Sequence, residues 1–214
     1  FALPDDPHWL VRHFSVGGVD YVWIVNLMTR QEDADHIPVQ GAERKVDTLP
    51  QYVGIETNTR STVVTISGKN DFYVVDAVKQ KAMATVKTNG VIKTKVQTGT
   101  WQGTLLVFYP HLPVRMHAKP LSDAKAGRDF VVDIKIYAAD SSKNTVPFSL
   151  PLSVKVYNPD GQENREYNQR LMAENGKCKV KIPFALNDDG GIYKLEVIEE
   201  TTGLATSLKI PLRK

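Results

Sequence analysis

Two tryptophans and a histidine are the side chains of this sequence best suited to binding a ligand. Trp9 lies near the N-terminus, Trp101 lies in the polar stretch TGTWQGT, and His13 belongs to VRHFSVGGVDYVWIVN. An exposed aromatic ring covers the apolar C–H face of a sugar while polar neighbours hold its hydroxyls. Trp9, Trp101 and His13 are therefore the candidate carbohydrate-binding residues. For the two tryptophans, packing in a core or at a domain interface is the favoured interpretation, and a ligand platform is the alternative.

No catalytic residues are predicted. Glycoside hydrolysis needs two carboxylates that face each other across a cleft, and no acid in the sequence has a neighbouring signature that marks it. Asp76, in VVDAVKQKA, suits the start of a hairpin turn. There is no Gly-x-Ser-x-Gly elbow, and Cys178 lies within the strand-like GKCKVKIP, which favours a buried small hydrophobe. We therefore predict that the chain is not an enzyme.

No metal site and no cofactor are predicted either. The five histidines are dispersed, and the single cysteine forms neither an internal disulfide nor a zinc site. The segments NPDGQ and NDDGG collect carboxylate and amide oxygens, but they lack the alternation of ligands that a calcium loop requires. Both segments are typical of tight turns, as is the Asn-Gly pair in ENGK.

The elements that must position these side chains are strands. A period of two recurs in ten segments bounded by Gly, Pro, Asn or Asp, and it predicts an all-β fold. In GIYKLEVIEE, alternation assigns Tyr193, Leu195, Val197 and Glu199 to the core side. DYVWIVNL is apolar on both sides and reads as a central strand, so we expect Tyr21 and Trp23, together with Phe14, to pack in a core.

Two consecutive antiparallel β-sandwich domains of the Ig-like kind are expected. The boundary is placed near Pro113, in a proline-rich connection, which gives domains at 1–113 and 114–214. The long polar segment 28–54 inside the first domain predicts a functional loop or a stretch that packs on a neighbour.

Charge and hydropathy narrow the possible partners. The formal net charge is +3, with Lys and Arg scattered along the sequence, so we predict no nucleic-acid partner. No apolar run approaches the roughly 18 to 20 residues that span a bilayer, so no membrane partner is predicted. The chain begins at Phe1 rather than Met, so we interpret it as a trimmed or processed piece of a longer protein, and the lack of a signal-like N-terminus then indicates nothing about its location.

The sequence resembles two known kinds of module. VRHFSVGGVDYVWIVN, STVVTISGKNDFYVVDAVKQKAM and GTLLVFYP resemble the C-terminal β-sandwich accessory domains of large bacterial glycoside hydrolases of the β-galactosidase-like kind. VKVYNPDGQ and ENGKCKVKIPFALNDDGGIYKLEVIEETTGL are similar to Ig-like modules, including those of the macroglobulin type. Together these patterns cover most of the chain, although the segment 28–54 is not part of the family pattern.

The resemblance implies a non-catalytic accessory region of a glycoside-hydrolase-like protein. Its partners would be a preceding catalytic module of the same polypeptide and a polysaccharide, in an extracellular or periplasmic location. Two alternatives remain open at this point. One is a carbohydrate-binding module that uses Trp9 or Trp101. The other is a protein-interaction or adhesion module that uses the segment 28–54 and the surface of the second sandwich.

Overall fold

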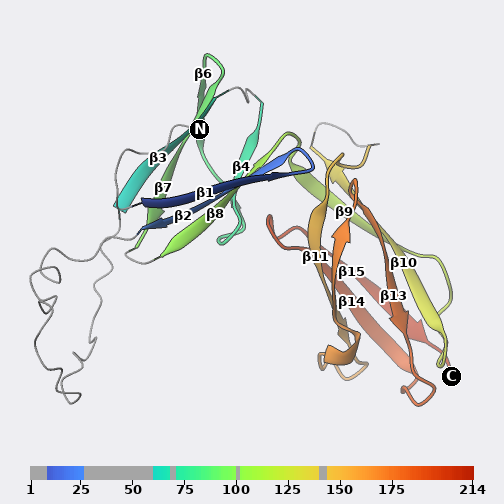
Figure 1. Cartoon of the computed structure of the whole chain (residues 1–214). Helices are drawn as coiled ribbons and strands as arrows, with labels where there is room; N and C mark the ends of the chain where they lie inside the picture. Colours follow the sequence, from blue (N-terminus) through green and yellow to red (C-terminus); the bar gives the residue numbers. More distant parts are fainter. Residues whose placement is uncertain (1–8, 27–59, 68–70, 100–101, 140–143) are drawn as a thin grey trace, which may run out of the picture. The chain divides into compact units, whose positions relative to one another are not determined.

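The computed structural model describes residues 9–26, 60–67, 71–99, 102–139 and 144–214 (Figure 1). Within these ranges the chain forms fifteen strands and one short 3₁₀ helix, η2 (Arg165–Tyr167). The prediction of an all-β fold is therefore confirmed. Trp101 and the segment 28–54 lie outside the described residues, and the predictions made for them stay predictions.

The first eight strands form two sheets, with the orders β1-β2-β8-β4-β5 and β3-β7-β6. A Gly17-Gly18 turn, with φ of +57° and +85°, joins the first two strands, and both angles favour glycine. The strands are β1 (Trp9–Val16), β2 (Val19–Asn26), β3 (Arg60–Ser67), β4 (Tyr73–Asp76), β5 (Lys81–Ala82), β6 (Thr85–Thr88), β7 (Val91–Thr98) and β8 (Gly103–Tyr109).

The remaining strands form an antiparallel sandwich from a three-stranded sheet, β13-β10-β9, and a four-stranded sheet, β12-β11-β14-β15 (Figure 1). The strands are β9 (Pro113–Pro120), β10 (Asp129–Ala138), β11 (Leu150–Tyr157), β12 (Gln169–Ala173), β13 (Lys177–Pro183), β14 (Gly191–Glu199) and β15 (Ala205–Leu212).

Contacts between described residues group them into two compact units. One unit holds residues 9–13, 22–26, 60–67, 84–99 and 102–105, and the other holds residues 14–21, 71–83, 106–139 and 144–214. Pro113, where the sequence places the domain boundary, is the first residue of β9. The division at that residue stays a prediction.

Strand β2 corrects one expectation from the sequence. Val22 and Ile24 are fully buried, whereas Trp23 between them is 39% exposed. The buried set also contains Asp20 and Asn26, whereas the set that holds Trp23 has no charged or amide side chain, so polarity alone pointed to the wrong face. The indole of Trp23 lies over Gly103 of β8, where an added Cβ would come within 3.3 Å of the ring. Trp23 therefore covers a neighbouring glycine and is not a core residue.

The C-terminal sandwich has a core that follows its sequence pattern. Tyr193, Leu195, Val197 and Glu199 of β14 are all buried, as alternation predicted. Phe184 joins the inner aromatic rings, with centroids 5.1 Å from Tyr193, 5.5 Å from Tyr167 and 6.3 Å from Phe130. In antibody domains a tryptophan and a disulfide occupy the centre of the sandwich. In this sandwich the described core is filled by aromatic rings and aliphatic side chains.

The predicted tight turns are confirmed at two of the sites. Asn175 and Gly176, with φ of +50° and +67°, form the turn between β12 and β13. A Cβ on Gly176 would lie 2.8 Å from Val146 and 2.9 Å from the carbonyl oxygen of Ile136, so this position requires glycine for space as well as for φ. In NPDGQ, the Asp160 carboxylate accepts from the backbone N–H of Gln162 at 3.1 Å.

Candidate binding surface

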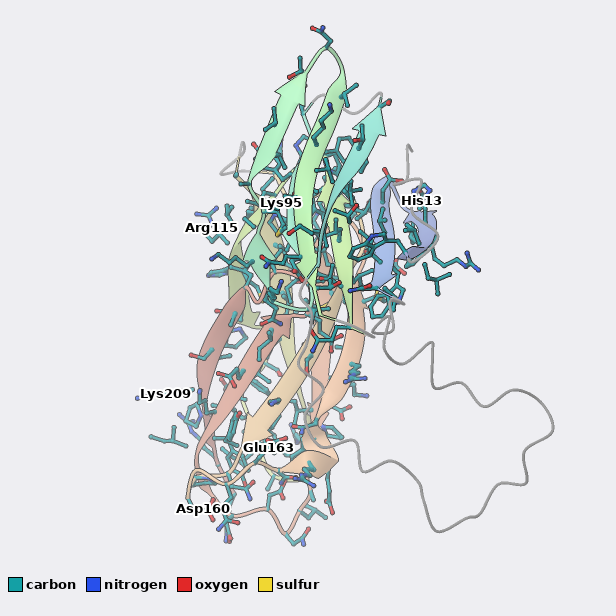
Figure 2. The ribbon with its side chains drawn as sticks, turned by 90° about the vertical axis from the view of Figure 1, so that its left-hand side faces the viewer. His13, Lys95, Arg115, Asp160, Glu163 and Lys209 are labelled. Carbon is teal, nitrogen blue, oxygen red and sulfur yellow. The ribbon has the colours of Figure 1, made fainter. Side chains whose placement is uncertain are left out.

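Two of the three candidate sugar-binding residues, Trp9 and His13, lie in the described part of the chain, on strand β1. Trp9 is half-buried at the start of β1, and His13 is exposed on the same strand. Alternation puts Trp9 and His13 on one face of β1 and Phe14 on the other. Figure 2 labels His13 on this strand. The proposed sugar-binding role of these residues stays a prediction.

The aromatic residues near the Gly-Gly turn form an exposed pair. Phe14 and Tyr21 stack with their ring centroids 5.0 Å apart and their planes within 5°. Phe14 is 48% exposed and Tyr21 is half-buried, so the expectation that this pair packs inside a core is wrong. Burial, followed by the negative charge of Glu199, raises the pKa of Tyr21. The pair is an apolar spot on the surface of its unit.

A denser arrangement of polar and aromatic groups lies on the outer side of the four-stranded sheet. Tyr157 of β11 is paired with Lys194 of β14, which is paired in turn with Lys209 of β15. In the neighbouring row, Lys155 is paired with Glu196. Directly opposed residues of an antiparallel pair project to the same face. We call these five residues the Tyr157 face. Figure 2 labels Lys209, whose side chain projects outward from its strand.

Hydrogen bonds and a cation–π contact fix the side chains of Tyr157, Lys194 and Glu196 relative to one another. The Tyr157 hydroxyl donates a hydrogen bond to Glu196 Oε2 at 3.0 Å. Lys194 Nζ donates to Glu196 Oε1 at 3.3 Å and lies 5.2 Å from the centroid of the Tyr157 ring. Each carboxylate oxygen thus accepts one hydrogen bond on the face and keeps a second lone pair, and the ammonium lies within cation–π range of the ring.

These contacts also set the charge state of the face. The hydrogen bond to Glu196, followed by burial, raises the pKa of Tyr157. Burial raises the pKa of Glu196, but the hydrogen bonds from Tyr157 and Lys194 outweigh it, so the net direction is downward. At neutral pH the tyrosine is therefore a neutral donor and the glutamate is an anion. With three lysines and one glutamate, the Tyr157 face is net cationic.

A shallow hollow of about 600 Å³ opens beside the Tyr157 ring. Its rim includes Asn158, Pro159 and Gly161 of the turn that follows β11, together with Ile192 of β14. Ile192 is 60% exposed. Gly161 has a φ of +85°, which lets the turn bend back at the edge of the hollow. Apolar, amide and charged groups therefore converge on one open concavity.

This arrangement suits binding better than bond cleavage. Among the described residues that line the hollow, Glu196 alone carries a carboxylate, whereas glycoside hydrolysis uses two. The Tyr157 ring can cover an apolar patch of a polar ligand. The ammonium of Lys194, the carboxylate of Glu196 and the amide of Asn158 can then hydrogen-bond the polar groups around that patch. In the part of the chain that the structure describes, no group of three or more His, Cys, Asp or Glu side chains could hold a metal ion.

Sequence reasoning identified only part of this surface. The alternation of GIYKLEVIEE assigned Ile192, Lys194 and Glu196 to the side away from the core, and the structure confirms that side. Tyr157 was not singled out, because its proximity to Glu196, 39 positions away, depends on the pairing of β11 with β14. The available signal in the sequence was the position of Tyr157, an aromatic residue at the end of a strand and directly before the Asn158-Pro159 turn.

Comparison with known proteins gives distant likenesses only. No family model and no curated protein sequence matches the chain. A β-glucuronidase from Bacteroides uniformis is similar at 10% identity and a TM-score of 0.28, over 72% of this chain and 26% of that one. The chicken interferon gamma receptor alpha chain is similar at 10% identity and a TM-score of 0.27, over 94% and 96%. Likenesses at this level carry no functional argument.

None of the helical structure in the described residues is long and apolar enough to cross a membrane.

Proposed function

We propose that this chain is a non-catalytic accessory region of a larger glycoside-hydrolase-like protein and that its C-terminal sandwich binds a carbohydrate ligand on the Tyr157 face. The observation that carries the proposal is the position of the Tyr157 ring beside an open hollow. The ring is held there by a hydrogen bond of 3.0 Å from its hydroxyl to Glu196 Oε2. The resemblance of the sequence to accessory modules supports the wider setting. That setting includes a preceding catalytic module and an extracellular or periplasmic location.

The geometry favours a polyhydroxylated ligand for two reasons. An aromatic ring removes the apolar face of a sugar from water, which is the main favourable term in such contacts. The neighbouring Glu196, Lys194 and Asn158 offer acceptors and donors on the same side, which would fix the orientation of hydroxyl groups. A fixed ring also loses little conformational freedom on binding.

The test is a glycan array on the purified chain, followed by titration of each glycan that binds. Tyr157→Ala is expected to weaken binding about tenfold, which is the size of a lost ring contact. Tyr157→Phe is expected to weaken it less, because the ring remains. Tyr73→Ala is the matched control, since Tyr73 is 40% exposed on β4, outside the Tyr157 face.

Two results would overturn the proposal. Equal glycan binding by Tyr157→Ala and the unmodified chain would show that the Tyr157 face is not the binding site. Loss of glycan binding in Trp9→Ala instead would place the site on β1. Turnover of aryl glycosides by the purified chain, retained through repeated chromatography, would contradict the non-catalytic role.

A protein-interaction module is the second candidate function, and the exposed Phe14–Tyr21 stack favours it. Exposed aromatic pairs are enriched where proteins associate. If this function holds, Phe14→Ser should abolish capture of the partner by the chain and leave glycan binding unchanged. Cross-linking of the unmodified chain to the preceding module of its own polypeptide would identify that module as the partner.

A further inference from the structure

The outer side of the three-stranded sheet gathers positive charge that the sequence disperses. β13 reads Lys-Cys-Lys-Val-Lys-Ile-Pro, and its three lysines alternate with the inward Cys178, Val180 and Ile182. The register with β10 and β9 adds further cations to the same side. The full set, which we call the basic face, is Arg115, Lys119, Lys135, Lys177, Lys179 and Lys181.

The charge of this face exceeds that of the whole chain. Six cations stand against two carboxylates, Asp129 and Asp133, so the formal net charge of the face is 6 − 2 = +4. The complete sequence has a formal net charge of +3. The expectation that Lys and Arg are merely scattered therefore does not hold for this sheet, because pairing of three strands brings distant residues together.

Internal ion pairs neutralise only part of the basic face. Lys181 Nζ lies 2.7 Å from Asp129 Oδ2, and Lys135 Nζ lies 3.4 Å from Asp133 Oδ2. Among the described residues, no ion pair joins a carboxylate to Lys119, Lys177 or Lys179, and all three are exposed. The potential on this face is therefore positive and open to an external anion.

The spacing of the cations indicates an extended ligand. Alternate residues of a strand lie about 7 Å apart, so the three lysines of β13 form a line rather than a converging cluster. Lys179 and Lys119 flank Asp133 on adjacent strands, at about 10 Å from each other. A small anion would meet one or two of these groups, whereas a chain with regularly repeated anionic groups would meet the whole line.

Two features disfavour nucleic acid and peptide as the extended ligand. The Tyr137 ring is covered by the Arg115 guanidinium, 4.5 Å from its centroid, so it offers no open platform for stacking a base. The edge of β13 is engaged by its own chain, where Gln169 Nε2 donates to the Lys181 carbonyl oxygen at 2.7 Å. That contact obstructs strand addition by a peptide at this point. Figure 2 labels Arg115.

We propose that the basic face binds a linear acidic polysaccharide through its repeated carboxylate or sulfate groups. Lysine ammoniums act as point charges on flexible stems and tolerate variation in the spacing of these groups. The binding is electrostatic and takes place at exposed side chains, and each lysine along β13 adds to the affinity. It is separate from the Tyr157 face and does not depend on the carbohydrate site proposed there.

The experiment measures binding of the full chain to polygalacturonate and to dextran sulfate, with uncharged dextran as the blank, by affinity electrophoresis and calorimetry. Binding to at least one acidic polymer is expected at low salt, and it should fade towards about 0.5 M NaCl as screening shortens the range of the charges. The two polymers distinguish carboxylate from sulfate as the preferred group.

Charge location is tested with two triple variants of equal charge. Lys177→Gln/Lys179→Gln/Lys181→Gln is expected to weaken binding about tenfold, because each exposed ion pair contributes at most a few-fold. The matched control is Lys87→Gln/Lys93→Gln/Lys95→Gln, which removes three exposed lysines of β6 and β7 and should retain the affinity. Figure 2 labels Lys95 of this control set. Melting temperatures of both variants verify that each is folded.

Three outcomes would overturn the proposal. The first is no binding of either acidic polymer at low salt by the unmodified chain. The second is an equal loss of affinity in the two triple variants, which would mean that only total charge matters. The third is tighter binding of polyglutamate or single-stranded DNA than of either polysaccharide, which would assign the basic face to a different polyanion.

Discussion

The hydroxyl of Tyr109 is hydrogen-bonded to the hydroxyl of Thr201, which lies 92 positions later in the chain. Thr201 Oγ1 donates its own proton to Glu199 Oε1 at 2.6 Å, so Tyr109 must be the donor to Thr201. Glu199 is fully buried and also accepts from the backbone N–H groups of Thr201 and Thr202. A buried carboxylate satisfied by hydroxyl and amide donors thus ties the end of β8 to the turn between β14 and β15.

Removing the Tyr109 hydroxyl should lower stability without disturbing the packing of the ring. The ring stacks on Phe148 at 5.4 Å, and Phe fills the same volume, so Tyr109→Phe isolates the hydrogen bond. We expect a loss of about 1 to 2 kcal/mol in the free energy of unfolding, measured by urea denaturation. Tyr137→Phe is the control, because its half-buried ring packs under Arg115, and it should change stability by less than about 0.5 kcal/mol. An equal loss in both variants would contradict the role assigned to Thr201.

The fold was predictable wherever only one side of a strand could enter a core. In β14 the two alternating sets differ in polarity, and the buried set was identified correctly, including the unusual Glu199. In β2 both sets contain apolar side chains, but the buried one also holds Asp20 and Asn26, and Trp23 was wrongly expected in the core. Periodicity names the two faces of a strand, but the sheet packed against it decides which face is buried.

The candidate surfaces could be predicted only in part. Outward positions such as Lys194, Lys177 and Lys179 follow from alternation within one strand. The pairing of β11 with β14, and of β9 with β10 and β13, brings Tyr157 to Glu196 and Lys119 to the row of Lys179. Register depends on turns and on packing across the whole sheet, and a single sequence does not specify it.

The carboxylate of Asp76 should be a structural acceptor, as its sequence context predicted. Asp76 is 1% exposed at the end of β4, and its Oδ1 accepts from the N–H groups of Val78 and Lys79 at 3.1 Å each. Asp76→Ala leaves both donors without this acceptor and should cost about 2 kcal/mol. Asp76→Asn keeps one acceptor oxygen but loses the ion pair with Lys79 at 3.3 Å, so it should cost about half as much. Chemical denaturation measures both, and an Asn variant as unstable as the Ala variant would contradict the turn-acceptor role.

Stability should decline at alkaline pH because of Tyr167. Burial, followed by the hydrogen bond to Asp188, raises the pKa of Tyr167 to about 12, and the hydroxyl donates to Asp188 Oδ2 at 2.5 Å. Since the folded pKa exceeds the unfolded value of about 10, the folded state retains its proton longer. The contribution is complete below about pH 10 and is lost as the pH rises through about 12. When complete, this contribution to the free energy of unfolding amounts to at most about 3 kcal/mol.

Tyr167→Phe separates this effect from general alkaline denaturation. The variant loses the hydrogen bond at neutral pH, and the slope of its unfolding free energy between about pH 10 and pH 12 should be shallower than that of the unmodified chain. Burial also raises the pKa values of Tyr109 and Tyr193, so a residual slope should remain. Identical slopes in the two proteins would exclude Tyr167 as a cause of the decline.

The thiol of Cys178 should be nearly inert in the folded protein. It is half-buried on the inner side of β13, and burial, followed by the negative charge of Asp133, raises its pKa to about 11. At pH 8 its thiolate fraction is then about one in a thousand, against about a quarter for a free cysteine. We expect an aromatic disulfide reagent to label the native chain roughly a hundredfold more slowly than the chain unfolded in urea. Equal labelling rates would mean that β13, and with it the row of lysines on its outer side, opens readily from the sheet, because only the thiolate exposed to solvent reacts.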